Sequence, residues 1–463
     1  MTKHPRDFIE TFGKRNRMKY FLAGTLAALI LLSLVAWRIQ PRETDAGRVT
    51  LVWSSDDNPA RREQIELFNR THPRYKLVLD PSAESLEKVI VQCIGGVGPD
   101  IIDWGRGDDL IKAGVVLDLT EQLKKIGVNY EKDTWEFSRR CSSYGGRIYG
   151  FPTNAASNAL WYNKDIFDHA GIPYPKGPWK WEQFIPLAQR LMVRDKNGRV
   201  TQYGFLSDWD LWTQFAWQWG GRMFTKDGTR CIIDSPQAVA GLQFVHDLIY
   251  KYRVMPTPAE QKTMATQGGW GTGNITLFGG GKGAMAMGGR WWLCLLRQYE
   301  HLRMGAVESP YDHYRVNVGG SRCSFINKNS PHRQGALEFI KFLDSEQYNE
   351  LINHQADAVA PVPRYCYTKE YLHDPAYPNE DSNAVWRDTM TYSRIDEISP
   401  FVSPLVVLRI LTKQTDLVLN NQKSPAEALK TGALQVNAEI RNSIQRDPSL
   451  RREYERLTRE KAK

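Results

Sequence analysis

The sequence predicts an α/β protein in which helices cover both faces of a parallel sheet. Three strand-like segments, 48–53, 75–80 and 99–104, alternate with two helical segments near the start of the chain. This alternation indicates a parallel sheet, because parallel strands need a crossover connection that is usually a helix. The chain has 463 residues, 41% of them hydrophobic and 24% charged, which is ordinary for about two or three globular domains.

The first two helices are predicted from their caps and apolar spacing. We expect the first helix to have Asp57 or Asn58 as its cap and Pro59 in its first turn. The second helix is expected to run from about 84 to 94. Ligand sites in such sheets lie beyond the carboxyl ends of the strands, which here are the residues after 53 and after 103.

Helices become more frequent in the rest of the chain. Ser235, Ser330 and Ser345 are the expected caps of three of them. The predicted helical segments are 179–193, 235–252, 330–352 (as two helices), 403–419 and 424–440. The predicted strands are 283–289, which glycines flank, and a connected pair within 316–327. Residues 373–399 are predicted to be mostly loop.

An apolar segment near the start predicts export from the cytoplasm. Tyr20 to Trp37 is a run of eighteen residues without a charge, and basic residues precede it. We expect 1–19 to be a cytoplasmic basic segment, 20–37 a transmembrane anchor and 38–47 a linker. The body would then face the periplasm or the cell exterior. A cleaved secretory signal, with the body released into the periplasm, is the alternative.

The distribution of charge does not indicate a nucleic-acid partner. The net charge is +9, and the basic residues gather at the two ends of the chain. The front group flanks the apolar segment, and the back group is interleaved with acids, which is typical of a solvated helix face.

Six cysteines are spread without any CxxC or zinc-type Cys/His spacing, so no metal or cofactor is predicted. In an exported chain their positions are compatible with one or two disulfides and equally with buried free thiols. These cysteines are Cys93, Cys141, Cys231, Cys294, Cys323 and Cys366.

The chain lacks the local motifs of common enzymes. It contains neither GxSxG nor HExxH. The stretch "GGGKGAM" around Lys282 lacks the spacing of a phosphate loop, and "GTGNIT" from Gly271 lacks the third glycine of a dinucleotide fingerprint. A glycoside hydrolase, which needs only two suitably placed carboxylates, is the less favoured alternative. We expect a protein that is not an enzyme.

Several stretches resemble one family of binding proteins. They are "TLVWSSDD", "GPDIIDWGRGDDLIKAGVVLDLT", "YGFPTNAASNALWYNKDIF", "GKGAMAMGGRW", "GALEFIKFL" and "SPAEALKTGALQVNAEI". Their order resembles that in the extracellular solute-binding proteins of the cluster that includes maltose-binding protein, the capture subunits of ABC-type sugar importers. The resemblance covers nearly the whole exported part, from about Arg48 to Ile440.

The resemblance implies a periplasmic-binding-protein-like fold. Two α/β lobes joined by crossing strands would close on a ligand in the cleft by a hinge motion. Lobe one would comprise 48–154 and 321–362, and lobe two 158–318 and 365–463. The crossings would lie near 154–158, 318–321 and 361–364. ABC permease subunits would be the partners, and the binding protein would be a monomer.

The resemblance and the chemistry of sugars together suggest ligand contacts. Aromatic rings pack on the C–H faces of a sugar, while carboxylate, amide and guanidinium groups hydrogen-bond its hydroxyls. The candidates are Ser55, Asp57, Trp104, Arg106, Asn154, Trp209, Trp212, Trp291, Gly320 and Arg364.

The sequence leaves some of these ligand-contact and function assignments open. Asp57 is equally suited to capping a helix. Of the helical faces that carry Trp209 and Trp212, one is expected to be core. The maltose-binding type has a glutamate in the first crossing, whereas this chain has small and amide residues near Ala156, so the sugar is not identified. A membrane-tethered sensor and a binder of a non-sugar solute are the alternative functions.

Overall fold

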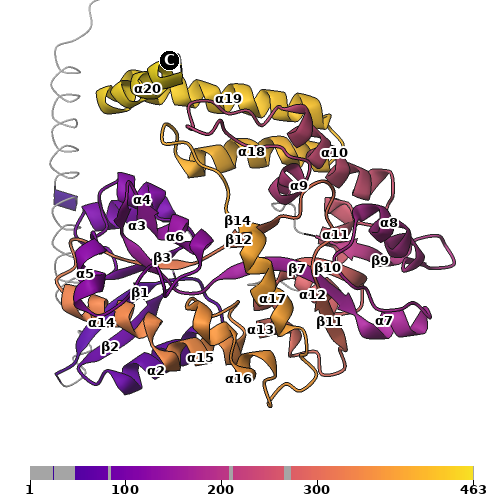
Figure 1. Ribbon diagram of the computed structural model, residues 1–463, viewed down its shortest axis with the longest axis horizontal. Helices are drawn as coiled ribbons and strands as arrows, with labels where there is room; N and C mark the ends of the chain where they lie inside the picture. The colour runs from indigo at the N-terminus through magenta and orange to yellow at the C-terminus, as the bar shows by residue number, and fades with distance from the viewer. Residues whose placement is uncertain (1–23, 26–46, 82–84, 208–211, 265–272, 462–463) are drawn as a thin grey trace, which may run out of the picture. The chain divides into compact units, whose positions relative to one another are not determined.

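The computed structural model describes residues 24–25, 47–81, 85–207, 212–264 and 273–461. Almost all of the predicted anchor, 20–37, lies outside these residues. Among the described helices, none combines the length and the apolar character that crossing a membrane requires. Residues Val49–Lys463 form one unit that contains two main sheets (Figure 1).

The first sheet is built mainly from the start of the chain. Its central strands β1 and β3 are parallel, as predicted, and β13 returns antiparallel beside β3. The strand order is β2 (Tyr75–Asp80), β1 (Val49–Ser54), β3 (Ile101–Trp104), β13 (Cys323–Ile326) and β6 (Gly150–Pro152). A two-stranded hairpin of β4 (Ser143–Tyr144) and β5 (Arg147–Ile148) precedes β6.

Helices pack around this sheet because their apolar stripes need cover. Trp53 in β1, for example, is buried against Phe339 of α14, with ring centroids 5.1 Å apart. The helices are α2 (Arg61–Thr71), α3 (Leu86–Ile94), α4 (Asp108–Lys112), α5 (Thr120–Lys125), α6 (Glu136–Ser142), α14 (Arg333–Asp344) and α15 (Glu346–Gln355).

Two predicted caps are wrong and two, Ser235 and Ser345, are confirmed; the Ser235 side chain accepts from the Ala238 N–H. Helix α2 begins at Arg61, and the Asn58 side chain accepts from the Ala60 N–H one turn earlier, while Asp57 is exposed. Helix α14 begins at Arg333, so Ser330 caps the preceding turn by accepting from the His332 N–H. Ser345 accepts from the Tyr348 N–H and caps α15 as predicted.

The second sheet forms from the middle of the chain. Strand β7 pairs antiparallel with both β10 and β12. The order is β14 (Ser393–Arg394), β12 (Asn317–Gly320), β7 (Ala156–Asn163), β10 (Gly283–Gly289), β9 (Val200–Leu206) and β8 (Val193–Arg194), with β11 (Met304–Val307) paired to β7. The strands predicted at 283–289 and within 316–327 are therefore confirmed.

Helices from two parts of the chain surround the second sheet. From the middle come α7 (Lys164–His169), α8 (Trp181–Arg190), α9 (Trp212–Gln218), α10 (Pro236–Tyr250), α11 (Pro258–Met264), α12 (Asn274–Gly279), the 3₁₀ turn η2 (Arg290–Trp292) and α13 (Leu293–Leu296). From the end come η3 (Pro363–Cys366), α16 (Lys369–Leu372), α17 (Asn383–Thr389), η4 (Met390–Tyr392), α18 (Pro404–Leu419), α19 (Pro425–Arg446) and α20 (Pro448–Lys461).

The segment 373–399 contains more regular secondary structure than the sequence predicts. Residues 373–399, predicted as loop, contain α17 and β14. Trp386 of α17 is buried against Trp161 of β7, with ring centroids 4.7 Å apart, so tertiary packing rather than a local pattern supports this short helix. Helices α18, α19 and α20 lie together at the top of Figure 1.

Two short connections carry the chain between the sheets. The first runs from β6 to β7 through 153–155, and the second from β12 to β13 through 321–322. The Ser321 hydroxyl donates to the Asn154 carbonyl oxygen at 2.5 Å, so the two connections lie side by side. A further link is the pair of backbone hydrogen bonds between Ala155 and Val359, both 2.9 Å long.

One buried carboxylate holds both connections to the first sheet. Asp103 in β3 is fully buried and accepts from the hydroxyls of Ser55 (2.6 Å) and Thr153 (2.8 Å). It also accepts from Nε of Arg322 at 2.6 Å. Thr153 belongs to the first connection and Arg322 to the second, so a single side chain fixes where both leave the sheet.

We predict that Asp103→Asn lowers the free energy of unfolding by about 2–4 kcal/mol, because it leaves buried donors without a charged acceptor. Urea unfolding followed by fluorescence measures the change. Asp57→Asn makes the same substitution at an exposed position and is expected to change the free energy by less than about 0.5 kcal/mol. Equal effects of the two substitutions would contradict the role given to Asp103.

Candidate ligand-binding site

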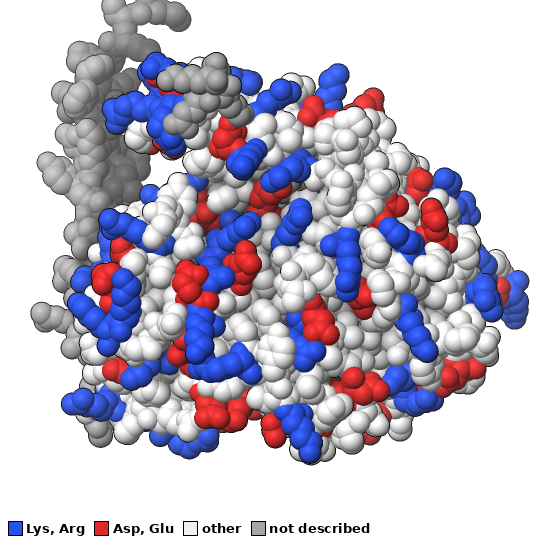
Figure 2. Space-filling model, viewed as in Figure 1, with Lys and Arg blue, Asp and Glu red and all other residues white. Residues whose placement is uncertain are grey.

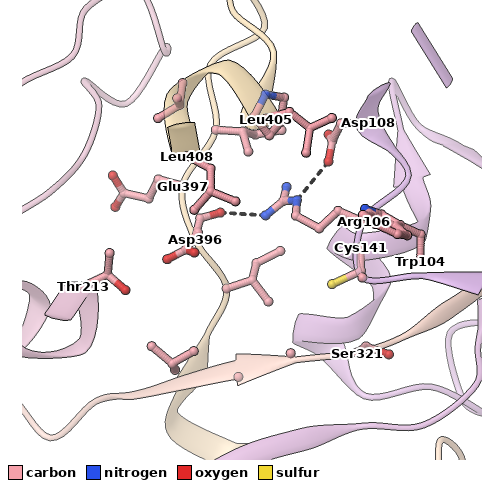
Figure 3. Close-up of a pocket in the computed structure, with 18 of the residues that line it drawn as sticks. Trp104, Arg106, Asp108, Cys141, Thr213, Ser321, Asp396, Glu397, Leu405 and Leu408 are labelled. Atoms are coloured by element: carbon pink, nitrogen blue, oxygen red, sulfur yellow. Dashed lines mark hydrogen bonds and ion pairs between the residues drawn. The ribbon is translucent and has the colours of Figure 1, made fainter. Parts of the chain in front are cut away.

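A cavity of about 990 Å³ lies between the two sheets. Its lining comes from the loop after β3, both connections between the sheets, the start of α9, η2, and the segment that leads into α18. Figure 3 shows side chains from both sides converging on it. A volume of this size suits a small-molecule ligand, since such sites are usually about 300–1,000 Å³.

The floor of the cavity is formed by the connections. Asn154, only 6% exposed, lines it and donates through Nδ2 to Asp357 at 3.4 Å. Its Oδ1 accepts from the Arg322 N–H at 3.2 Å. Ala156, the first residue of β7, and Gly320, the last residue of β12, also line the floor. Their small size leaves room above it. The small residues of the first connection therefore make space for a ligand where a larger side chain would occupy it.

A buried arginine supports the acidic part of this floor. Arg61 is fully buried, with its Nε 2.8 Å from Asp56 and its Nη1 hydrogen-bonded to Asp357. Burial alone lowers the pKa of Arg61, but Asp357 and Asp56 together raise it, so the guanidinium stays charged. Asp357 also accepts from Asn58 at 2.9 Å. Asp56, Asn58 and Asp357 are thus held in fixed positions at the cavity.

The first-sheet wall is formed by Trp104 and Arg106, and Arg106 spans the cavity. Its Nε pairs with Asp108 at 2.9 Å, while its Nη1 donates to the Asp396 carbonyl oxygen at 2.7 Å (Figure 3). Burial lowers the pKa of Arg106, but Asp108, Cys141 and Asp396 together raise it above its ordinary value. Lys112 makes a second link of the same kind, donating to the Pro400 carbonyl oxygen at 3.3 Å.

The opposite wall is aromatic. Trp291 stands nearly perpendicular to Trp292, at an interplanar angle of 79°, and lines the cavity, while Trp292 is buried. A Cβ on Gly289 would lie 2.5 Å from the Trp291 ring, so only glycine leaves the ring in this position. Trp212 and Thr213 line the cavity from the start of α9. Trp217, farther along α9, is buried and is not part of the lining, so it is the start of this helix that reaches the ligand space.

Helix α18 supplies a wall that the sequence does not predict. Leu405, Leu408 and Leu411 line the cavity, and Leu408 is 59% exposed. Before α18, Glu397 accepts from the backbone N–H groups of Met223 (3.0 Å) and Phe224 (3.2 Å), which fixes this segment to the connection between α9 and α10. The apolar spacing of 403–419 predicts a helix, but a leucine that faces a cavity has the same pattern as one that faces a core.

The structure brings six of the predicted contacts together. The predicted residues that line the cavity are Trp104, Arg106, Asn154, Trp212, Trp291 and Gly320. Trp209 lies outside the described residues.

Three predicted contacts lie elsewhere. Ser55 is buried and its hydroxyl is bonded to Asp103, and Asp57 is exposed; their neighbours Asp56 and Asn58 line the cavity instead. Arg364 is outside the lining because it forms an ion pair with Asp133 and lies 4.0 Å from Asp344.

The comparisons with known proteins agree with this architecture. Residues 53–350 match the family described as bacterial extracellular solute-binding protein. The chain belongs to this family. It is therefore a solute-binding component of an ABC importer, and it is a binding protein rather than an enzyme.

Two curated relatives are sn-glycerol-3-phosphate-binding periplasmic proteins. The one from Rhizobium meliloti is 25% identical over 85% of this chain and 94% of the relative. The one from Agrobacterium fabrum is 26% identical over 58% of this chain, and the match spans 61% of the relative's length.

Two solved structures show the same fold. An ABC substrate-binding protein from Listeria monocytogenes in complex with cycloalternan has a TM-score of 0.73 and 21% identity, covering 84% of this chain and 98% of that protein. The UgpB protein from Mycobacterium tuberculosis in complex with glycerophosphocholine has a TM-score of 0.69 and 16% identity, covering 86% of this chain and 100% of that protein. The predicted periplasmic-binding-protein-like fold is confirmed.

The position of Arg364 leads to a prediction about pH. Burial and the adjacent Asp133 carboxylate raise the pKa of Asp344 to about 6, although Arg364 lowers it. In the unfolded chain the pKa of an aspartate is about 4. The protonated Asp344 carboxyl therefore stabilises the folded protein at low pH, and this stabilisation is lost as the pH rises from about 4 to about 6.

We therefore expect Asp344→Asn to match the wild type near pH 4 and to be more stable by on the order of 1 kcal/mol at pH 7, after allowance for solvent screening. Urea unfolding at several pH values measures the difference between the two proteins. A difference that does not vary with pH would show that Asp344 does not titrate in this way.

Proposed function

We propose that this protein captures a carbohydrate in the cavity between its two sheets and delivers it to ABC permease subunits. The observation that carries the proposal is the combination of aromatic walls with a polar floor. Trp104, Trp212 and Trp291 present rings to the cavity, and Asn154 and Asp357 present oxygen and nitrogen atoms. Rings suit the C–H faces of a sugar, and fixed polar groups suit its hydroxyls.

The charges of the lining favour a neutral ligand over a phosphate. Among the described lining residues the basic ones are Arg106 and Arg322, and both are already paired with carboxylates. Arg106 pairs with Asp108 and Arg322 with Asp103. The acidic side chains of the lining are more numerous: Asp56, Asp108, Asp109, Asp357, Asp396, Glu397 and Asp416. A phosphate would have to displace existing ion pairs beside this excess of negative charge.

The links across the cavity support capture by closure. Arg106 from the loop after β3 and Lys112 at the end of α4 donate to backbone oxygens of Asp396 and Pro400, in the segment that leads into α18. Because carbonyl acceptors carry no net charge, such links are weak enough to break and form again. In our proposal they break when the protein opens and re-form when the ligand is enclosed.

The remaining parts of the proposal concern organisation. We propose that 48–154 with 321–362 and 158–318 with 365–463 move as two lobes, and that the protein acts as a monomer. We also propose that 20–37 anchors it in the membrane with its body outside. One curated relative, from Streptomyces antibioticus, carries the description uncharacterized lipoprotein, which is compatible with tethering. Acidic and basic side chains alternate over the described part of the face in Figure 2.

A thermal-shift screen tests the function. A ligand specific to the folded state raises the melting temperature, by an amount that grows with its concentration relative to Kd. The panel contains mono- and oligosaccharides, cyclic oligosaccharides, sn-glycerol 3-phosphate and glycerophosphocholine. We expect a shift with a carbohydrate and none with the phosphates. If only a phosphate compound raises the melting temperature, the ligand is of the glycerophosphate type and the proposal of a carbohydrate is wrong.

Trp291 provides the test of the site. We predict that Trp291→Ala weakens binding of the carbohydrate found in the screen by about tenfold or more, because a stacked ring contributes at least ~1.4 kcal/mol. Trp291→Phe keeps a ring and is expected to retain most of the affinity. Titration calorimetry measures both. Tyr314→Ala is the control, since Tyr314 is 60% exposed and lies outside the lining. Unchanged affinity in Trp291→Ala would place the ligand elsewhere.

A further inference from the structure

Two of the six cysteines lie in contact beside the cavity. Cys141 is in the last turn of α6, and Cys323 is the first residue of β13. The Cys323 thiol donates to the Ser321 hydroxyl oxygen at 3.7 Å, and both Cys323 and the backbone N–H of Ser321 lie close enough to the Cys141 sulfur to lower the pKa of that thiol. Both cysteines are buried in the same apolar cluster, and both are free thiols in this structure. The second connection between the sheets therefore begins against one sulfur and ends at the other.

The two sulfurs differ in environment. Cys141 lines the cavity, and Figure 3 shows its sulfur beside Arg106 and Trp104, whereas Cys323 is fully buried. The neighbouring Cys323 lowers the pKa of Cys141 and the Arg106 guanidinium lowers it further, which together outweigh the effect of burial. Burial raises the pKa of Cys323. Cys141 is thus the sulfur that an oxidant entering through the cavity would meet, and also the better nucleophile of the two.

We propose that Cys141 and Cys323 form a disulfide in the exported protein, which ties α6 to β13 directly after the second connection. The family is extracellular, and disulfides form and persist outside the cytoplasm. The bond requires the two sulfurs to approach to about 2 Å. Cys141 lies in the last turn of the seven-residue helix α6, so the approach involves the end of a short helix.

The reaction is a pair of thiol–disulfide exchanges with an external disulfide, either a small molecule or an oxidoreductase. The Cys141 thiolate attacks one sulfur of that disulfide, forms a mixed disulfide and releases one thiolate. Cys323 then loses its proton to solvent and attacks the Cys141 sulfur, which forms the intramolecular bond and releases the second thiolate. Two electrons and two protons pass from the cysteines to the external disulfide, which is reduced to two thiols.

The other cysteines have different surroundings. Cys93 shares the apolar cluster of the pair and is the one competing partner within it. Cys231 and Cys366 are buried in two other clusters, and Cys294 is hydrogen-bonded to backbone oxygens of Gln355 and Ala356. We therefore expect four of the six cysteines to stay reduced.

The disulfide would act on the wall of the ligand site. The Gly107 N–H donates to the Cys141 carbonyl oxygen at 2.8 Å, so the end of α6 holds the loop that carries Arg106. Fixing Cys141 to β13 would fix this loop relative to the second connection, whose Arg322 is bonded to Asp103. The oxidised protein would thus have a more rigid first-sheet wall than the reduced protein.

Mass spectrometry tests the proposal on the full chain isolated from membranes of the exporting cell. The protein is denatured and alkylated without reduction, then digested. We expect four alkylated cysteines and one linked pair of peptides that contain positions 141 and 323. Six alkylated cysteines, persisting after incubation of the folded protein with oxidised glutathione, would overturn the proposal. A link from Cys93 to either residue would also overturn it.

Matched variants give the second measurement. Cys141→Ser is expected to leave five alkylated cysteines, Cys323 among them, and no linked peptides. Cys231→Ser, a substitution at another buried cysteine, is expected to keep the link and leave three alkylated cysteines. Reduction of the wild type is expected to lower its melting temperature by about 5 °C, because the link closes a long loop in the unfolded chain. An unchanged melting temperature would contradict a bond formed in the folded state.

Discussion

The buried carboxylate of Asp103 constrains the geometry of the whole binding unit. Its oxygens accept from Ser55 at the end of β1, from Thr153 in the first connection and from Arg322 in the second. A charge in this position is costly to bury unless each lone pair has a donor. The three donors therefore have to stay where they are, and the two connections leave the first sheet from a fixed point. Any motion of the second sheet has to take place beyond this point.

The cavity follows from that arrangement. The small residues of the connections form its floor, and larger side chains from the two sheets form its walls. Arg61 holds Asp56 and Asp357 in place from below, and Asp108 holds Arg106 from the side. Because the cations beside the cavity are engaged by carboxylates, the lining has little charge to offer a phosphate. It offers rings and fixed hydrogen-bonding groups, which match a neutral polyol.

The sequence predicts the fold better than it predicts the site. Strands β1, β2 and β3 and helices α3, α10 and α19 follow from local patterns that agree with their packing. The sequence points to Ser55 and Asp57, whereas Asp56 and Asn58 line the cavity, because β1 ends at Ser54 and the alternation of a strand does not decide orientation in the loop beyond it. The sequence predicts that α18 is a helix, but only the assembled structure shows that its leucines face a cavity. Helix α17 has no clear local pattern because Trp161, distant in sequence, supports it.

The central claim is that two lobes, joined at the connections beside Asp103, close over a carbohydrate. Small-angle X-ray scattering with and without the carbohydrate identified by the thermal-shift screen tests this claim most directly. A saturating ligand is expected to lower the radius of gyration of the wild type and to leave that of Trp291→Ala unchanged at the same concentration. A wild-type radius of gyration that stays constant at ligand saturation would contradict capture by closure.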